Sequence, residues 1–364
     1  MNTIFWTLLT AVCSPFLFLA AQLRPRSAKR KILIIQWAKL GDMVCTTPMF
    51  RAIKEAHPDW TVHVLCRQSS AVALQGNPFI DRVIVGGTRG GMIQMLSRER
   101  YDAVINCLPG AFFSLVGLWC GARDRINTFS QRLGHLIRWT RVCNTVNLEY
   151  RPGDGTFRHY MKLVNALNVP AIPYQLDFFP SANDQRVIDE WMAVHVLTPG
   201  KFLCCNVSAG NAIKEWPMEH WVSLIDQITE KGMSVVLCTL DRQRVSDLRA
   251  RSKNPDLVHD GSGFSLGQMG VLAKNASAYV AADTGPLYVA YAAGAKIVAI
   301  VGGSSPSEQL PPLGSMVVHV LPPAECVPWM FVTASPRQAT KEQVWCVRGT
   351  MPETVLEEVW KLIR

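Results

Sequence analysis

Short runs of apolar, mostly β-branched residues alternate with helical stretches along most of this 364-residue chain. One series of runs lies at residues 32–36, 61–65, 81–85 and 102–106, and a second at 202–207, 234–240, 256–259, 278–282 and 296–301. Continuous apolar strands separated by helices are typical of parallel sheets covered on both faces. Two such series predict an α/β protein with two doubly wound domains.

The helices and the domain boundary follow from the segments between these runs. We expect helices at about 45–57, 218–231, 241–252, 265–275, 286–293 and 352–363. Residues 168–181 carry three prolines and no clear period, so the linker is placed there. The predicted division is an N-terminal segment (1–30), a first domain (31–175), a second domain (176–345) and a C-terminal helix (346–364), which we expect to pack back on the first domain.

The N-terminal segment predicts contact with a membrane. Residues 2–23 carry no charge, and as a helix they would span about 33 Å, the thickness of a bilayer's hydrocarbon core. Five cations follow: Arg24, Arg26, Lys29, Arg30 and Lys31. The positive-inside rule then predicts a single N-terminal pass with the remainder in the cytoplasm. An interfacial helix bent at Pro15 and a cleaved signal peptide are alternatives, although a basic region before the apolar stretch is missing.

Composition excludes several classes of protein and favours anionic partners. With 49% hydrophobic and 18% charged residues, the chain is neither disordered nor collagen-like. Its net charge of +9 suits a membrane surface, a phosphorylated substrate or nucleic acid, but nucleic-acid binding has no supporting motif. Eleven cysteines without a CxxC pair or zinc-type spacing indicate reduced core thiols rather than a metal site.

Asp42 is the first candidate site residue. It follows the run at 32–36 and Gly41, where a chain turns from strand to helix. Ligands bind open α/β sheets at the carboxyl ends of strands, and a carboxylate there can act as a general base. A helix N-cap is the alternative role for this aspartate.

Two further candidates follow strands of the second series. Ala209 and Gly210 come after the run at 202–207, with Lys214 close behind; small residues expose amides to phosphate oxygens and lysine adds a point charge. The segment 283–285 (Asp-Thr-Gly) offers hydroxyl and amide donors at a predicted helix N-terminus. A surface turn and an ordinary helix cap are the alternatives. The dinucleotide fingerprint GxGxxG is absent, which counts against an NAD-dependent dehydrogenase.

The sequence also resembles a known family. KILIIQWAKLGDMVCTTPMF (31–50), GNPFIDRVI (76–84) and YDAVINCLPG (101–110) are similar to the opening of family 9 glycosyltransferases, the heptosyltransferases of lipopolysaccharide core assembly. KEWPMEHW (214–221) and AADTGPLYVAYAAGAKIVAIVG (281–302) resemble the donor-side motifs of that family. The resemblance covers about residues 31–305. It implies a GT-B fold, in which the first of two Rossmann-like domains binds acceptor and the second binds nucleotide-sugar, and inverting chemistry that needs no metal or other cofactor.

The resemblance also implies roles for individual residues. Asp42 matches the catalytic base, and Lys214 matches the lysine that neutralises the diphosphate. Ala209 and Gly210 lie where the family has its phosphate-binding loop. Donor sugar hydroxyls and phosphates would be held by Asp283, Thr284 and Gly285, while Asp241 is a weaker candidate for the donor ribose.

One position departs from the family pattern. Relatives commonly have His three residues after the glycine of D-[ST]-G-P-x-H, and this chain has Tyr288 there, which cannot become cationic at neutral pH. A transferase that uses another nucleotide-sugar is therefore an alternative, as is a non-catalytic, membrane-anchored scaffold protein.

A basic run at 121–141 completes the candidates. It contains Arg123, Arg125, Arg132, Arg138 and Arg141, and Arg123 and Arg125 could bind an anionic acceptor. A solvated or membrane-facing helix is the alternative. The resulting hypothesis is a transferase at the cytoplasmic face of the inner membrane that moves heptose from ADP-heptose to an anionic glycolipid.

Overall fold

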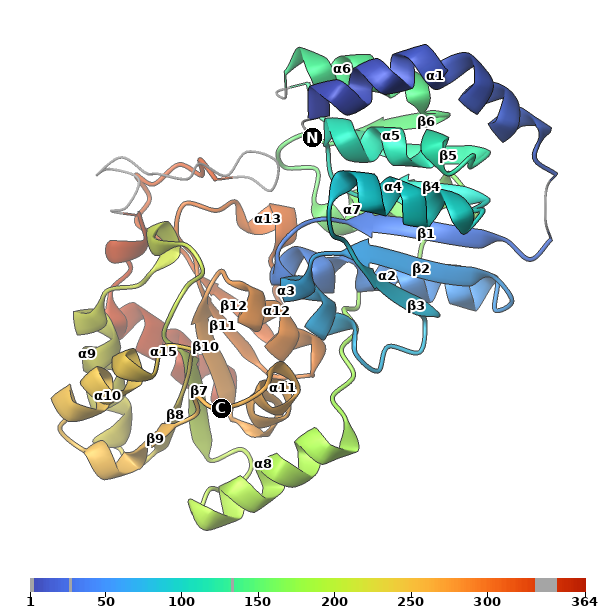
Figure 1. The fold of residues 1–364 in the computed structure, drawn as a ribbon. Coiled ribbons are helices and arrows are strands. Elements are labelled where there is room, and N and C mark those ends of the chain that lie inside the picture. The colour runs from blue at the N-terminus through green and yellow to red at the C-terminus, as the bar shows by residue number, and fades with distance from the viewer. Residues whose placement is uncertain (1–2, 26–27, 132–133, 331–345) are drawn as a thin grey trace. The chain divides into compact units, whose positions relative to one another are not determined.

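Two compact units make up the chain. The computed structural model describes residues 3–25, 28–131, 134–330 and 346–364. The units are Met1–Gln175 and Leu176–Arg364, and each is built around a six-stranded parallel sheet (Figure 1). The division falls within residues 168–181, which form neither helix nor strand.

The first sheet has the strand order β3-β2-β1-β4-β5-β6. Its strands are β1 (Lys31–Gln36), β2 (Thr61–Cys66), β3 (Arg82–Val85), β4 (Ala103–Asn106), β5 (Asp124–Phe129) and β6 (Val146–Glu149). The side chains of residues 32–35 in β1 are completely buried, as expected for a central strand covered on both faces.

Helices cover this sheet on both faces (Figure 1). They are α1 (Thr3–Leu23), α2 (Leu40–Ala56), α3 (Gln68–Ala71), η1 (Val72–Leu74), α4 (Arg89–Arg98), α5 (Ala111–Trp119), α6 (His135–Thr140), η2 (Arg141–Cys143) and α7 (Thr156–Asn165). The expected helix at 45–57 is thus confirmed as α2, which begins five residues earlier.

The second sheet has the order β12-β11-β10-β7-β8-β9, which repeats the topology of the first. Its strands are β7 (Phe202–Asn206), β8 (Ser234–Cys238), β9 (Val258–Asp260), β10 (Ala278–Ala282), β11 (Ile297–Ile300) and β12 (Val317–Val320). Its helices are α8 (Ala182–Val194), η3 (Ala212–Lys214), α9 (Met218–Thr229), α10 (Arg242–Arg251), η4 (Pro255–Leu257), α11 (Leu266–Asn275), α12 (Gly285–Ala292), α13 (Pro306–Gln309) and α15 (Pro352–Ile363).

The basic run at 121–141 is not one helix, so the alternative of an exposed helix holds only for its end, where α6 and η2 lie. Residues 124–129 form β5, which pairs with β4 on one side and β6 on the other. Its polar residues Asn127 and Thr128 are buried, and Asn127 accepts hydrogen bonds from Asn106 (2.9 Å) and Ser114 (2.9 Å). The helix α6 starts only at His135, and Arg132 lies outside the described residues.

The C-terminal helix packs on the second sheet rather than back on the first domain. Val355, Val359 and Leu362 of α15 are buried in the same core as Val298 and Ile300 of β11. Lys296 also donates to the carbonyl of Leu362 (3.0 Å). The apolar face that the spacing predicted is therefore used within the second unit.

The N-terminal helix α1 is part of the first unit and lies along α5 (Figure 1). Trp6 is buried against Phe112 and Trp119, and the Trp119 indole donates to Thr10 Oγ1 (2.8 Å). Among the described residues, α1 is the helix whose length and composition would allow it to cross a membrane. The helix continues through Pro15.

The basic flank that follows α1 is paired with acidic side chains. Arg24 forms an ion pair with Asp102 (3.7 Å), Arg30 with Asp124, and Lys31 with Glu99. Arg26 lies outside the described residues. These pairs join the end of the flank to the amino ends of the strands.

Candidate functional site

Asp42 lies where the strand order of the first sheet reverses. From β1 the chain continues to β2 on one side, while β4 lies on the other, and open α/β sheets bind ligands at this kind of switch point. Lys39 caps α2 with its backbone, and Asp42 is the third residue of the helix. The N-cap alternative is therefore wrong, although the carboxylate still lies in the first turn, where the helix dipole favours negative charge.

A buried polar network supports this turn. Gln36, the last residue of β1, donates to Thr46 Oγ1 (2.6 Å) and to the Tyr160 hydroxyl (3.0 Å). Thr46 donates to the backbone carbonyl of Asp42 (2.7 Å). Burial raises the pKa of Tyr160, and the Asp42 carboxylate raises it further, so Tyr160 stays a neutral phenol beside Asp42. The network joins β1, α2 and α7.

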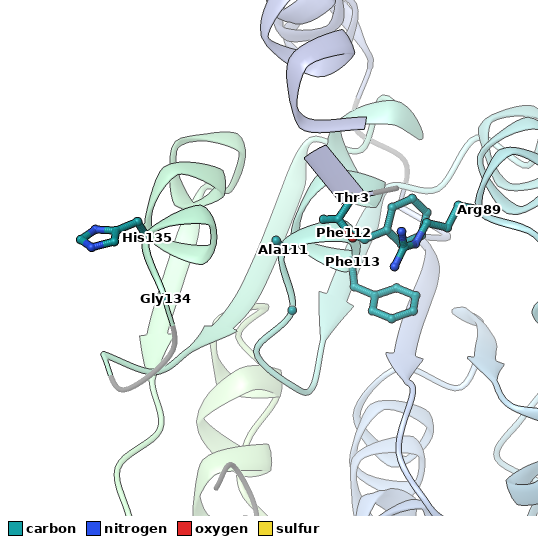
Figure 2. A pocket seen from close by; sticks show the side chains of 8 residues that line it. Thr3, Arg89, Ala111, Phe112, Phe113, Gly134 and His135 are labelled. Atoms are coloured by element: carbon teal, nitrogen blue, oxygen red, sulfur yellow. The ribbon is translucent and has the colours of Figure 1, made fainter. Parts of the chain in front are cut away.

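A cavity of about 500 Å³ opens at the same carboxyl edge of the first sheet (Figure 2). Its lining comes from the starts of the helices that follow three successive strands, with Arg89 after β3, Gly110 to Phe113 after β4, and Gly134 and His135 after β5, and from Thr3 of α1. Figure 2 shows Arg89, Phe112 and Phe113 grouped together, with the His135 ring pointing away. Arg89 lies 5.3 Å from the Phe112 ring centre. The cavity thus combines aromatic surface with a cation.

In the second unit, Lys214 and Asp283 meet at the matching switch point. β7 leads to Lys214 and β10 leads to Asp283, and these two strands are neighbours at which the strand order reverses. Lys214 Nζ lies 2.6 Å from Asp283 Oδ2. Two candidates that are 69 positions apart in the sequence therefore form one ion pair.

Asp283 is buried and held by several donors. The Tyr288 hydroxyl donates to Asp283 Oδ1 (2.6 Å) from the next turn of α12. Burial by itself raises the pKa of this carboxyl, but the Lys214 ammonium and the hydroxyls of Tyr288 and Ser304 outweigh it, so the pKa falls below its ordinary value of 3.8. Tyr288 thus stabilises the charged form of Asp283, and it stands at the position where relatives of the resembled family have His.

The small-residue loop after β7 lies beside this pair. Ser208 and Ala209 are partly exposed and Gly210 is exposed, with open space where a Cβ at Gly210 would lie. Asn206 donates to the Ser208 carbonyl (3.1 Å) and to Thr284 Oγ1 (3.1 Å). Because Thr284 caps α12 and Gly285 is its first residue, the loop and the helix N-terminus meet at one place that suits an anion.

Asp241 is the N-cap of α10. Its Oδ1 accepts from the Arg244 backbone N–H (3.1 Å), and its own N–H donates to Thr239 Oγ1 (3.1 Å). Thr239 in turn pairs with Ser208 (2.6 Å), which links Asp241 to the loop after β7. Its side chain is exposed, at the carboxyl edge of β8.

The structure does not bring Arg123 and Arg125 to Asp42. Both lie at the amino end of β5, at the opposite edge of the sheet. Arg125 is buried and donates to the carbonyls of Cys143 (2.6 Å) and Ala122 (2.6 Å), and burial lowers its pKa. Arg123 donates to the Arg24 carbonyl (3.1 Å). Their observed partners are backbone groups within the first unit.

Several residues of both sites were not singled out from the sequence. Gln36 and Asn206 are polar residues that end otherwise apolar strands, a signal that could have identified them. Tyr160, Ser304 and the cavity-lining Arg89 carry no comparable local signal. Within the described ranges, no three His, Cys, Asp or Glu side chains gather so that they could hold a metal ion.

The comparison with protein families identifies the chain. A family model described as glycosyltransferase family 9 (heptosyltransferase) matches residues 89–335, more than half of the chain. The protein belongs to this family. It is therefore a glycosyltransferase of the heptosyltransferase family.

Related proteins and structures are similar over most of their length. Lipopolysaccharide heptosyltransferase 2 of Escherichia coli K12 is 25% identical over 308 residues, which are 78% of this chain and 85% of the relative. Lipopolysaccharide heptosyltransferase 3 of Escherichia coli is 21% identical over 280 residues (72% and 81%).

The solved structures agree in fold. A family 9 glycosyltransferase from Veillonella parvula matches with a TM-score of 0.76 at 19% identity, covering 93% of this chain and 98% of that one. The E. coli ADP-heptose lps heptosyltransferase II matches with a TM-score of 0.70 at 20% identity, covering 92% and 98%. The GT-B arrangement of two Rossmann-like domains that the resemblance implied is thus confirmed.

Proposed function

We propose that this glycosyltransferase transfers heptose from ADP-heptose to a lipopolysaccharide-core or related glycolipid acceptor, with inversion and without a metal, at the cytoplasmic face of the inner membrane. The observation that carries the proposal is the Lys214–Asp283 pair at the switch point of the second sheet. The names of the relatives support the donor and the acceptor class.

The donor half of the mechanism belongs to the second unit. Lys214, held ready by Asp283, would neutralise the diphosphate as the glycosidic bond to it breaks. The amides of Ala209 and Gly210 and the N-terminus of α12 at Thr284 and Gly285 would bind phosphate oxygens. Asp283 and Thr284 would also orient donor hydroxyls, and the exposed Asp241 carboxylate would accept from the ribose.

The acceptor half belongs to the first unit. Asp42 would remove the proton from the acceptor hydroxyl as that oxygen attacks the anomeric carbon. The cavity beside Arg89 and Phe112 has the mixed cationic and aromatic lining that an anionic glycolipid needs. We therefore assign acceptor binding to this cavity rather than to Arg123 and Arg125, whose partners lie at the other edge.

Replacement of the proposed base tests this mechanism. Asp42→Asn should lower kcat about 10²- to 10⁴-fold, because general base catalysis contributes on that scale, while donor binding stays close to normal. Asp59→Asn, an exposed carboxylate of the same unit, is the matched control and should keep full turnover. Normal turnover in Asp42→Asn would show that the base is assigned wrongly.

Tyr288 favours one alternative, a different nucleotide-sugar donor. A panel of ADP-, GDP- and UDP-sugars can be compared by thermal shift, since a ligand that binds the native state raises its stability. We expect the largest shift with ADP-heptose, and an EDTA-treated enzyme should retain its rate. A larger thermal shift with a GDP- or UDP-sugar would identify that sugar, and not ADP-heptose, as the donor. Binding of a nucleotide-sugar without transfer to any acceptor would favour a scaffold role.

A further inference from the structure

The outer face of α1 is a continuous apolar surface. Along the helix, large side chains recur every three or four residues and are 53% to 77% exposed: Ile4, Leu8, Val12, Phe16, Leu19 and Leu23. We refer to these six residues as the α1 stripe. The opposite face of the helix holds the buried Trp6, Thr10 and Ala21, so packing on α5 leaves the α1 stripe facing outward.

A second exposed apolar group lies at the end of α6. Trp139 and Val142 are each 73% exposed, and Arg138 beside them is exposed as well. The start of α1 and the start of α6 line one cavity, through Thr3 and His135. Exposed tryptophan next to a cation is typical of the boundary between lipid headgroups and acyl chains.

The two units differ in net charge. The first unit has 21 Lys and Arg against 9 Asp and Glu, a formal charge of +12, whereas the second has 16 against 19, a charge of −3. The net charge of +9 therefore resides entirely on the unit that carries the α1 stripe. Such a unit is attracted to an anionic lipid surface, and the other unit is not.

We propose that the first unit docks on an anionic lipid bilayer through the α1 stripe, with α1 lying in the plane of the headgroup–acyl boundary instead of crossing the membrane. A crossing helix would have to give up the burial of Trp6 and the hydrogen bond from Trp119 to Thr10. In the docked position Thr3 brings the mouth of the cavity to the lipid surface. The proposal rests on the proposed function only for the role of that cavity.

Vesicle flotation tests the docking surface. The purified full-length protein should bind preformed vesicles that contain 30% phosphatidylglycerol, bind pure phosphatidylcholine more weakly, and dissociate as salt screens the charges. Val12→Asp should weaken binding at least about tenfold, since a buried Val is worth about 1.5 kcal/mol and 1.4 kcal/mol is a factor of ten. Val194→Asp is the matched control, because Val194 of the second unit is 78% exposed against 77% for Val12.

Depth measurements distinguish lying from crossing. Val12→Cys and Leu23→Cys can each carry a fluorescent label in a background where the partly exposed Cys13 and Cys326 are Ala. These positions are about 16 Å apart along a helix axis. A helix in the plane puts both labels at the same shallow depth, whereas a crossing helix puts position 12 near the bilayer centre and position 23 at its surface.

Three results would overturn the proposal: no binding to anionic vesicles, equal binding of Val12→Asp and the native protein, or a large difference in depth between the labels. A dimer in solution that Val12→Asp dissociates, without any vesicle binding, would assign the α1 stripe to a second copy of the chain. None of these measurements requires donor or turnover, so failure to dock and failure to transfer heptose are separable results.

Discussion

Asp283 is the side chain on which three elements of the second unit meet. Its carboxylate forms an ion pair with Lys214 of η3 and accepts hydrogen bonds from Tyr288 of α12 and Ser304 after β11. A buried carboxylate without such partners would be neutral, because burial disfavours the charged form. The proposed donor site therefore contains a negative charge that its hydrogen-bond donors and Lys214 stabilise, and this charge holds the lysine in place.

Removal of Lys214 tests how much the charged Asp283 carboxylate depends on its ion pair. Lys214→Ala should lower the free energy of unfolding by about 2–3 kcal/mol at pH 7, since it leaves Asp283 charged in a buried site with two weaker donors. In the native protein the pair contributes fully above pH 3.8, the ordinary pKa of the carboxyl, and is lost as pH falls through the lowered folded value. Urea unfolding should thus show the deficit of the variant shrinking at acid pH.

Tyr288→Phe distinguishes the contribution of the Lys214–Asp283 ion pair from that of the Tyr288 hydrogen bond. This variant keeps Lys214 and removes one donor at 2.6 Å from Asp283, so a smaller loss, about 1–2 kcal/mol, is expected. A loss in Tyr288→Phe as large as that in Lys214→Ala would mean that the hydroxyl, and not the ammonium, stabilises the carboxylate.

His159 should make the first unit sensitive to mild acid. The ring is buried in α7, where it pairs with Thr128 (2.9 Å), and burial lowers its pKa to about 4. Because the folded value lies below the ordinary 6.5, stability is complete above pH 6.5 and falls as pH drops toward 4. The native protein should lose about 2 kcal/mol more than His159→Gln between pH 7 and pH 5.

The exposed His135 offers a control for this pH series. His135→Gln should leave the dependence of unfolding on pH as it is in the native protein, because the His135 ring is exposed when folded. Equal slopes for His159→Gln and the native protein would assign the acid sensitivity to other groups.

At the scale of elements, nine of the twelve described strands were predicted from the sequence, but a smaller share of the helices was. Four internal helices of the second unit (α9 to α12), the C-terminal α15 and α2 lie close to their predicted places, because amphipathic spacing and cap residues are local signals. The helices α4, α5, α7 and α8 were missed. The strands β5, β6 and β12 were missed. Asn127 and Thr128 give β5 the composition of a loop. They can be buried because Asn127 forms hydrogen bonds with Asn106 and Ser114, and Thr128 forms one with His159.

The helix α15 provides a test at this scale. Val359→Ala should lower the stability of the second unit by about 2 kcal/mol, because Val359 is completely buried against the second sheet. Hydrogen exchange read by mass spectrometry should show faster exchange in peptides from β10 and β11. Faster exchange confined to β1 and β4 would instead place α15 on the first unit.

At the scale of the whole molecule, one topology occurs twice with different chemistry at each switch point. The first sheet has a carboxylate there and the second has an ion pair beside exposed amides. The opposite net charges of the units agree with the proposal that only the first binds an anionic acceptor and a lipid surface.

Donor binding should accordingly protect one unit. A nucleotide-sugar at 100 times its Kd should stabilise the second unit by about 2.7 kcal/mol and slow exchange in residues 208–211, 239–241 and 283–285. Residues 37–42 of the first unit should exchange as in the free enzyme. Protection that appears only in the first unit would contradict the assignment of the donor site.

The two sheets, the helices α1, α2, α9 to α12 and α15, and the places of Asp42, Lys214 and Asp283 after strands followed from the sequence, because strand periodicity, cap residues and motif spacing act over a few residues. The family followed from the resemblance of whole segments. The tertiary structure decided the pairing of Lys214 with Asp283, the packing of α15 on the second sheet and which face of α1 points outward. These depend on strand order and on which side of a helix is buried, and such contacts join residues that local patterns cannot relate.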